Sequence, residues 1–543
     1  MTGTDVGAGF DYAAHGLLPP PARPRLPGAP QTVAEVLDPV LAEEPEREAL
    51  VGRHGRLSYA GLDSAADRAA GALAALGVGP GDRVAVSLPN DVGIVVTFLG
   101  CMRLGAVWVG VNRALAPPEK AHVLRDCEAR VWLAEAAALA ALAAERETLP
   151  ALRHALAADP ADPASDWARA CAEASAGRPR VAIDPFAPAA IAYTSGTTGL
   201  PKGAVHSQHN LLLPGAVARE TGSFAPDERQ GVLLPLTILN LMVLVPLVAF
   251  QVGSACVAMD RIDPLGVAAW VREECVASFA APPTVLLDLL THPDLKPADL
   301  ASLRRPEVGG ADCPDRLRTL YRERFGAGVS IGYGLTEAPT AVARAAGDDP
   351  PLPGLCGRAL PQVELAILDP EGRALPPGEV GEICVGPARS GPFAGSYTPM
   401  LGYWRRPEAT AEALRGGWLW TGDLGELDRE GRLFIRGRRK ELILRGGANV
   451  YPAEVERVLA TAPGVAACAV AGRPDPRLGE RVVAWVVPAP GAARDAEALR
   501  THLVARLARY KVPSELVFVE TLPRNAMGKV TKHALRLPGE EGA

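Results

Sequence analysis

The stretch from Thr194 to Gly203 has the composition of a loop that binds phosphate. It reads Thr-Ser-Gly-Thr-Thr-Gly-Leu-Pro-Lys-Gly, with four hydroxyl side chains, three glycines and one lysine. Glycines let backbone N–H groups approach an anion closely, while hydroxyls and a lysine add donors and positive charge. The spacing differs from the G-x-x-x-x-G-K-S/T pattern of nucleoside triphosphatases. The sequence therefore predicts another kind of phosphate loop, placed after an apolar strand at Ala189–Tyr193.

Five further motifs follow this loop along the chain. They are Gly332–Glu337 (GYGLTE), Thr421–Asp423 (TGD), Gly437–Glu441 (GRRKE), Gly446–Pro452 (GGANVYP) and Pro523–Lys529 (PRNAMGK). Together with the loop, and in the same order, they resemble the signatures of the adenylate-forming superfamily, which includes acyl-CoA synthetases, peptide-synthetase adenylation domains and luciferases. The resemblance spans most of the chain and leaves only about the first 30 residues unaccounted for.

The resemblance implies an AMP-forming acid–CoA ligase that uses ATP, Mg²⁺ and coenzyme A. A carboxylate would attack the α-phosphorus of ATP, and the acyl group of the resulting adenylate would pass to CoA. Because the first step brings two anions together, the phosphate charge must be offset. By resemblance, Lys529 would stabilise the transition state, Glu337 would hold Mg²⁺, and Thr336 would donate to the α-phosphate.

The other nucleotide contacts are also implied by the resemblance. The residues expected at the ATP phosphates are Thr194, Ser195, Gly196, Thr197, Thr198, Gly199 and Lys202. Those expected at the adenine and the ribose are Gly310, Ala311, Asp312, Tyr333, Asp423 and Arg438. Asp423 and Arg438 would take the two ribose hydroxyls, while Tyr333 and the segment 310–312 would form the adenine slot.

Transfer to the thiol needs a second arrangement of the site. By resemblance, the small C-terminal domain would rotate about Lys440 and exchange Lys529 for the loop at Gly446 and Gly447. Those two glycines and Tyr510 are the residues expected to bind CoA. Val512 replaces a basic residue that helps some relatives to hold the CoA phosphates.

The segment Pro235–Leu241 indicates which acid is activated. Amino-acid-activating relatives have an Asp there, because a substrate ammonium in a dry pocket needs a paired carboxylate. This segment has no acidic residue, and it also lacks the aromatic or His of many acyl-CoA synthetases. A hydrophobic carboxylic acid is therefore predicted. The residues expected to line its pocket are Ile238, Asn240, Leu241, Met242, Gly309 and Pro339.

Two alternatives stay open. The acyl group could be loaded on the thiol of a carrier protein, although we expect no carrier domain in the 14 residues after Lys529. The chain could instead be a catalytically silent nucleotide-binding protein. The joint presence of Lys529, Glu337 and Asp423 argues against the silent protein.

Composition limits the classes of partner. The 56 basic and 62 acidic residues leave a net charge of −6, which disfavours nucleic acid as a partner. Nine scattered cysteines predict neither a zinc site nor a disulfide framework, and the N-terminus has no secretory signal, so a cytoplasmic protein is expected. The uncharged segment from Gln230 to Met259 is interrupted by Pro235 and Pro246, which favours a strand, a turn and a core helix over a membrane span.

The elements that position these motifs indicate an α/β fold, because short apolar runs alternate with helical stretches. We expect strands at Arg83–Leu88 and Gly253–Met259, and helices at Val92–Gly105 and Ala134–Glu145. The predicted organisation is a Pro-rich arm (1–30), a large domain of stacked β-sheets and helices that binds ATP and the acyl group (31–438), and a small mobile α+β lid domain (439–543).

Overall fold

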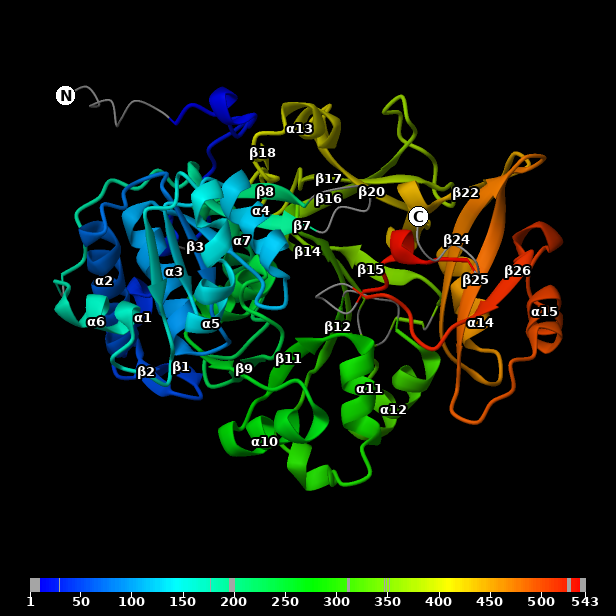
Figure 1. Ribbon diagram of the computed structural model, residues 1–543, viewed down its shortest axis with the longest axis horizontal. Helices are drawn as coiled ribbons and strands as arrows, with labels where there is room; N and C mark the ends of the chain where they lie inside the picture. The colour runs from blue at the N-terminus through cyan, green and yellow to red at the C-terminus, as the bar shows by residue number, and fades with distance from the viewer. Residues whose placement is uncertain are drawn as a thin grey trace. The chain divides into compact units, whose positions relative to one another are not determined.

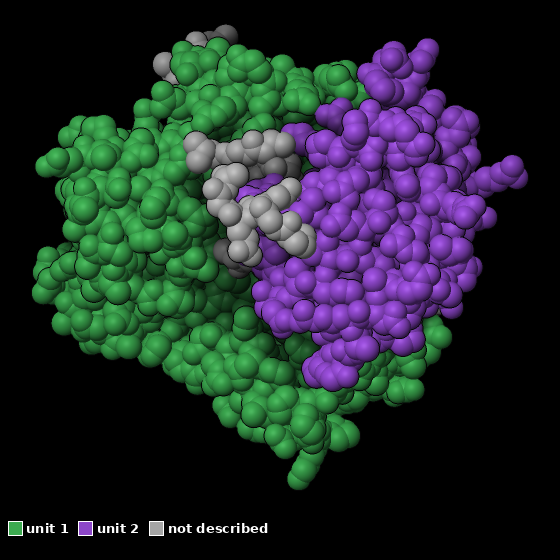
Figure 2. Space-filling view, turned by 45° about the vertical axis from the view of Figure 1, so that its right-hand side comes forward, with its two compact units in different colours: residues 1–194, 201–365, 385–420 green, residues 195–200, 366–384, 421–543 purple. Residues whose placement is uncertain are grey.

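The computed structural model describes residues 10–28, 30–175, 177–194, 201–309, 313–345, 347, 349–350, 352–524 and 529–537. Helices and strands alternate along most of the chain (Figure 1). The chain divides into two compact units, which Figure 2 shows in different colours. The first unit contains residues 1–194, 201–365 and 385–420, and the second contains 195–200, 366–384 and 421–543.

One sheet of the first unit is largely parallel. Within this unit, its strands follow the order β15-β14-β13-β12-β11-β9-β10-β1-β2, with parallel pairing from β13 to β1. The strands are β1 (Glu48–Gly52), β2 (Gly55–Ser58), β9 (Arg229–Val232), β10 (Ala255–Ala258), β11 (Ser278–Ala281), β12 (Glu307–Gly309), β13 (Ile331–Leu335), β14 (Ala338–Ala345) and β15 (Leu355–Ala359). The crossover helices are α10 (Pro264–Glu274), α11 (Pro283–Thr291) and α12 (Asp315–Phe325). Parallel strands joined by helices place β12 and β13, which precede two predicted site segments, side by side.

The second sheet of this unit has the order β18-β8-β7-β4-β3-β5-β6. Its strands are β3 (Arg83–Ser87), β4 (Val107–Gly110), β5 (Val131–Ala134), β6 (His154–Ala157), β7 (Pro188–Thr194), β8 (Lys202–Ser207) and β18 (Gly402–Tyr403). The helix α2 (Tyr59–Ala75) precedes β3, and the helices between the strands include α3 (Val92–Leu104), α4 (Pro117–Asp126) and α6 (Asp166–Glu173). The strands are parallel except at β8 and β18, so β7 and β8 form a hairpin that brackets the predicted phosphate loop.

The second unit contains a hairpin and a smaller sheet. The hairpin is formed by β20 (Trp418–Leu427), most of which lies in this unit, and β21 (Arg432–Arg438). The sheet has the order β23-β22-β25-β24, with β26 on the other side of β25. Its elements are β22 (Ile443–Arg445), β23 (Ala448–Val450), β24 (Val465–Asp475), β25 (Gly479–Pro488), β26 (Glu515–Phe518), α14 (Pro452–Ala460) and α15 (Ala496–Val504). Val455 and Leu459 of α14 and Leu503 of α15 are buried in one hydrophobic core with side chains of the sheet. The sheet and its helices therefore form one α+β arrangement.

The α/β prediction is confirmed, and one predicted helix is shorter than expected. Residue Ala134 ends the buried strand β5, and the helix α5 covers only Ala136–Ala141 before the chain tightens into a 3₁₀ turn at Ala143–Thr148. The alanine-rich sequence has a high helix propensity, but β5 pairs with β3 and β6 up to Ala134. Sheet pairing therefore overrides propensity at the start of this segment.

The uncharged segment 230–259 folds as a strand, a turn and a helical core, as predicted. After β9 the chain turns and forms α8 (Leu239–Met242), a π-helical turn (Val243–Leu247) and α9 (Val248–Val252). The π turn contains Pro246, whose missing N–H is tolerated where the helix is widened. Within the described ranges, no helix is long and apolar enough to cross a membrane.

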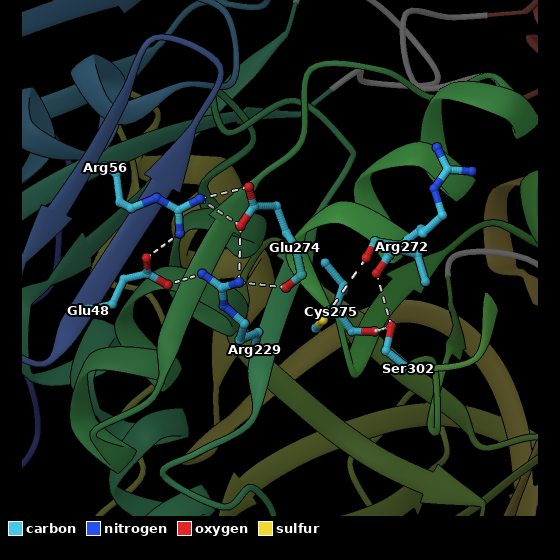
Figure 3. A network of polar contacts seen from close by, with 9 residues as sticks. Glu48, Arg56, Arg229, Arg272, Glu274, Cys275 and Ser302 are labelled. Carbon is cyan, nitrogen blue, oxygen red and sulfur yellow. Dashed lines mark hydrogen bonds and ion pairs between the residues drawn. The ribbon is translucent and has the colours of Figure 1, made fainter. Parts of the chain in front are cut away.

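A network of ion pairs joins three strands to the end of α10 (Figure 3). Arg56 on β2 donates to Glu274 at 2.8 and 2.9 Å, and Arg229 on β9 donates to the same carboxylate at 3.0 Å. Both arginines also pair with Glu48 on β1.

Cys275 follows the last residue of α10 and has the left-handed conformation, with φ of 50°. All nine cysteines lie in described ranges, and none is in a disulfide.

Candidate active site

The phosphate-loop candidates lie between the two strands of a hairpin. Thr194 ends β7 and Lys202 begins β8, and these two residues are directly paired. The Thr194 hydroxyl also donates to the Lys202 carbonyl at 3.4 Å. The structure therefore brings the two ends of the loop together, whereas Ser195, Gly196, Thr197, Thr198 and Gly199 lie outside the described residues.

Thr336 and Glu337 lie in the turn between β13 and β14, and both are half-buried. Glu337 Oε1 accepts a hydrogen bond from the hydroxyl of Tyr403 at 2.7 Å. The ring of Tyr403 also lies 5.3 Å from Lys202 Nζ, in cation–π geometry. The structure thus links the candidate metal carboxylate to the candidate phosphate lysine through one tyrosine that sequence reasoning missed.

A buried histidine supports the same turn. His206 on β8 donates from Nε2 to the carbonyl of Thr336 at 2.9 Å. Burial lowers the pKa of His206 to about 4, so the ring is neutral near physiological pH. Since its second nitrogen, Nδ1, is buried without a hydrogen-bond partner among the described residues, His206 positions the backbone of Thr336 and adds no charge.

The surroundings of Glu337 fit a magnesium ion held mainly by its substrate. Mg²⁺ usually keeps several waters and takes one or two carboxylates together with substrate phosphates. In the described part of the chain, no group of three His, Cys, Asp or Glu residues could hold a metal by itself. The hydroxyl of Tyr397 is buried with no hydrogen-bond partner among the described residues, and burial followed by the negative charge of Glu337 raises its pKa. A single carboxylate near a buried hydroxyl that has no partner among the described residues fits a magnesium site whose other ligands are waters and substrate phosphates.

The expected acyl-pocket residues lie on α8, on its N-cap residue Ile238, and on β12 and β14. Ile238, Asn240 and Leu241 are half-buried, whereas Met242 and Pro339 are buried. The side chain of Asn240 donates to the carbonyl of Leu335 at 3.2 Å, which places α8 beside the residue before Thr336. Asn240 Oδ1 is buried and has no hydrogen-bond partner among the described residues.

Two glycines, Gly309 and Gly110, lie at strand ends in the region of the expected acyl pocket. A Cβ atom built on Gly309 at the end of β12 would meet no described atom within 4 Å. A Cβ atom on Gly110 at the end of β4 would lie 2.0 Å from the carbonyl oxygen of Thr237. Gly110, which sequence reasoning missed, therefore lets β4 approach the segment before Ile238.

The adenine candidates are placed only in part. Tyr333 is buried on β13 and pairs with Ala343 on β14. Gly332 on the same strand pairs with Gly309 of β12. The segment that follows Gly309, containing Gly310, Ala311 and Asp312, lies outside the described residues.

The ribose candidates meet in the second unit. The β20–β21 register pairs Asp423 with Arg438, and Arg438 Nε lies 2.8 Å from Asp423 Oδ1. The side chain of Asp423 is only 6% exposed, whereas that of Arg438 is 51% exposed. The structure therefore places a nearly buried carboxylate beside a cation that still reaches solvent.

A buried glutamate fixes the turn that carries Asp423. Glu382 Oε1 accepts from the N–H of Gly422, which has φ of 73°, at 2.9 Å. Its second oxygen pairs with Arg439 at 3.0 Å. The Thr421 hydroxyl accepts from the N–H of Asp423 at 3.1 Å and donates to the carbonyl of Ile383 at 2.8 Å. Sequence reasoning missed Glu382, because nothing near it in the chain marks it as a support of this turn.

Lys529 lies within electrostatic reach of this pair. Although the residue as a whole is exposed, loss of water around the ammonium lowers its pKa, the charge of Arg438 lowers it further, and Asp423 opposes the shift. Motif residues from three distant parts of the sequence are thus gathered in one unit. The preceding residues of the last motif, 525–528, are outside the described ranges.

The CoA candidates also come together in the second unit. Gly446 and Gly447, with φ of 57° and 82°, form the exposed turn between β22 and β23. Arg445 beside them donates to the carbonyl of Tyr510 at 2.6 Å and to that of Val512 at 3.1 Å. The ring of Tyr510 is exposed. Lys440 lies exposed in the 3₁₀ turn Arg439–Glu441, and its role as a hinge stays a prediction.

Comparison with known proteins identifies the family of this chain. The sequence profile described as AMP-binding enzyme matches residues 37–404, and that of the AMP-binding enzyme C-terminal domain matches 454–529. Feruloyl-CoA synthase from Amycolatopsis sp is 38% identical over 490 residues, covering 89% of this chain and 94% of the relative. Indoleacetate–CoA ligase from Aromatoleum aromaticum is 36% identical over 511 residues, covering 93% and 97%.

A solved structure gives the same result. The ATP-bound MatB from Rhodopseudomonas palustris superposes with a TM-score of 0.82 at 31% identity, covering 92% of this chain and 97% of MatB. The fold and these matches define an AMP-forming ligase. The chain belongs to the AMP-binding enzyme family, in its acyl-CoA synthetase branch, which confirms the resemblance inferred from the motifs.

Proposed function

We propose that this protein is an ATP-dependent acyl-CoA synthetase that activates a hydrophobic carboxylic acid. The observation that carries the proposal is the grouping of Asp423, Arg438 and Lys529, three motif residues far apart in the sequence. A carboxylate, a guanidinium and an ammonium are the groups that nucleotide binding and phosphoryl chemistry require.

In the first step, a carboxylate oxygen of the acid forms a bond to the α-phosphorus of ATP. The bond from that phosphorus to the bridging oxygen breaks, and pyrophosphate leaves. Lys529 would stabilise the negative charge that develops on these oxygens. Lys202, Thr194 and Thr336, with the loop 195–199, would hold the phosphates, while Asp423 and Arg438 would bind the ribose. The adenine would lie against Tyr333 and the segment 310–312.

Glu337 is the residue that would hold Mg²⁺. The ion would offset the charge of the phosphates as the two anions approach. The contribution of the chain is to orient Glu337, through the Tyr403 hydroxyl, and to fix Thr336, through neutral His206.

In the second step, the sulfur of CoA bonds to the acyl carbon, the anhydride bond between that carbon and the phosphate oxygen breaks, AMP leaves with the electron pair of this bond, and the thiol proton passes to solvent. We propose that the turn at Gly446 and Gly447 and the exposed ring of Tyr510 bind CoA. The contacts of Arg445 with the Tyr510 region support this grouping. A domain boundary after Arg438 and a hinge at Lys440 belong to the same proposal.

The residues expected to line the acyl pocket support the proposed substrate class. Ile238, Leu241, Met242 and Pro339 are apolar, and no acidic residue lies in 235–241 to pair with an ammonium. The relatives named for ferulate and indoleacetate support a bulky hydrophobic acid with no α-amine. Each buried methylene contributes about 0.8 kcal/mol, so acetate should be a poor substrate.

The test is a pyrophosphate-release screen over acetate, octanoate, a benzoate and a polycyclic acid, each with and without CoA. We expect pyrophosphate with the larger acids and acyl-CoA plus AMP once CoA is added. Preference for acetate or an amino acid would overturn the substrate class. Adenylate without acyl-CoA would favour a carrier-protein thiol as acceptor, and no pyrophosphate with any acid would favour a silent nucleotide-binding protein.

A further inference from the structure

The N-terminal segment 10–18 precedes the part of the chain that matches the family, yet it is bound closely to the loop that carries Tyr403. The N–H of Leu18 donates to the carbonyl of Leu401 at 2.7 Å. The N–H of Arg405 donates to the carbonyl of His15 at 2.8 Å. Figure 1 shows this blue segment beside β18 and α13 (Pro407–Ala413). The segment is therefore packed within the first unit, against the residues around Tyr403.

Aromatic packing reinforces these backbone bonds. The ring of His15 stacks on Trp404, with 4.5 Å between the ring centres and 15° between the planes. Phe10 stacks on His15 at 5.1 Å. Trp404 is 1% exposed and shares a buried core with Leu17. The residue directly after Tyr403 is therefore fixed by side chains of the N-terminal segment.

One hydroxyl connects the segment to Tyr403 itself. The N–H of Tyr403 donates to Thr410 Oγ1 at 2.9 Å. The same hydroxyl lies 3.0 Å from the carbonyl of Gly16 and 2.9 Å from that of Arg406, both of which can accept its proton. The hydroxyl of Thr410 thus joins the carbonyl of Gly16, in the N-terminal segment, to the backbone N–H of Tyr403.

The side chain of Tyr403 ends at the candidate metal carboxylate. The terminal torsion of a glutamate is broad, so a carboxylate without a fixed partner samples many orientations. Donation from Tyr403 to Glu337 Oε1 at 2.7 Å restricts that rotation. Lys202 Nζ lies over the face of the same ring. Tyr403 therefore contacts both a cation of the phosphate loop and this carboxylate.

We propose that Tyr403 is a positioning residue for Glu337, and that the N-terminal segment 10–18 holds Tyr403 in place through Trp404 and Thr410. The inference rests on the proposed function only for the role of Glu337 at the nucleotide-bound metal. The segment thereby becomes part of the activating machinery and is more than a terminal extension.

The experiment compares Tyr403→Phe, His15→Ala, Thr410→Val and the double variant Tyr403→Phe/His15→Ala. Arg23→Ala is the matched control, because Arg23 lies on the same N-terminal arm but pairs with Asp184. Mn²⁺ affinity in the presence of a non-hydrolysable ATP analogue is measured by electron paramagnetic resonance, which needs no turnover. Thermal unfolding of each variant verifies that it is folded, and the apparent KM for Mg²⁺ is separated from kcat.

We expect Tyr403→Phe to weaken Mn²⁺ binding by about tenfold or more, the effect of losing a hydrogen bond to a charged group. His15→Ala and Thr410→Val should each weaken Mn²⁺ binding by a smaller factor. The effect of each on activity should appear as a higher apparent KM for Mg²⁺. In the double variant, His15→Ala should add little to Tyr403→Phe, because both act through the same hydroxyl. Arg23→Ala should bind Mn²⁺ like the wild type.

Unchanged Mn²⁺ affinity in Tyr403→Phe would overturn the positioning role. Full additivity of the double variant would overturn the coupling to the N-terminal segment, and Thr410→Val provides a second test of that coupling if His15→Ala does not fold. A wild-type protein that binds Mn²⁺ with the analogue but forms no adenylate would refute the proposed function alone. The Mn²⁺ comparison would still decide this inference.

Discussion

Replacing Asp423 by asparagine should weaken ATP binding strongly while leaving the fold nearly intact. The carboxylate is 6% exposed and pairs with Arg438, whose side chain is 51% exposed. Without its partner, this guanidinium can be rehydrated, so the free energy of unfolding should fall by no more than about 1 kcal/mol. A charged hydrogen bond to a ribose hydroxyl contributes about 1.5–3 kcal/mol, which corresponds to a rise of about 10- to 150-fold in the KM for ATP.

The assay is ATP–pyrophosphate exchange at varied ATP, with thermal unfolding measured on the same preparation. Asp428→Asn is the matched control, because Asp428 lies on the same hairpin and pairs with Arg432 at 2.7 Å, away from Asp423. The control should keep the wild-type KM for ATP. An unchanged KM in Asp423→Asn, or an equal rise in both variants, would refute the assignment of Asp423 to the ribose.

Three further predictions concern Lys529 and the hinge. Lys529→Ala should slow adenylation by about 10²–10³ or more and still convert a supplied acyl-adenylate to thioester; equal loss in both half-reactions would contradict its role. Because the pKa of Lys529 is lowered, its charge is lost as pH rises through that lowered value, so adenylation should decline at a lower pH than an ordinary lysine would give. Arg438→Ala removes the repelling charge and should move this alkaline limb to higher pH, which a pH profile of kcat/KM for ATP, a property of the free enzyme, will detect. Lys440→Pro should spare adenylate formation and impair thioester formation, because proline fixes φ at the proposed hinge; an unchanged overall rate would place the hinge elsewhere.

The sequence could predict the elements and motifs whose signals are local. Apolar runs gave the strands at Arg83 and Ala189 and the helix at Val92, and the Pro residues in 230–259 correctly indicated a turn and a core helix. Asp423 and Arg438 were named through their motifs, and the register of β20 and β21 then brings them together.

The residues that the sequence could not predict act across tertiary contacts. Glu382 supports the turn at Gly422 from a strand whose sequence carries no motif. His206 and Tyr403 reach the Thr336–Glu337 turn from β8 and β18, which pair with each other only in the folded sheet. The predicted extent of the helix that begins at Ala134 is also wrong. Ala134 belongs to β5, because it pairs with neighbouring strands, and helix propensity does not report strand pairing.

The most direct test of the acyl-adenylate mechanism is an isotope-transfer measurement. The acid is labelled with ¹⁸O in its carboxylate and converted to acyl-CoA with ATP and CoA, and the phosphorus products are analysed by mass spectrometry. Attack of the carboxylate on the α-phosphorus, followed by release of AMP, predicts one ¹⁸O atom in AMP and none in pyrophosphate. Label in pyrophosphate or in inorganic phosphate, or AMP formed without label, would contradict the account.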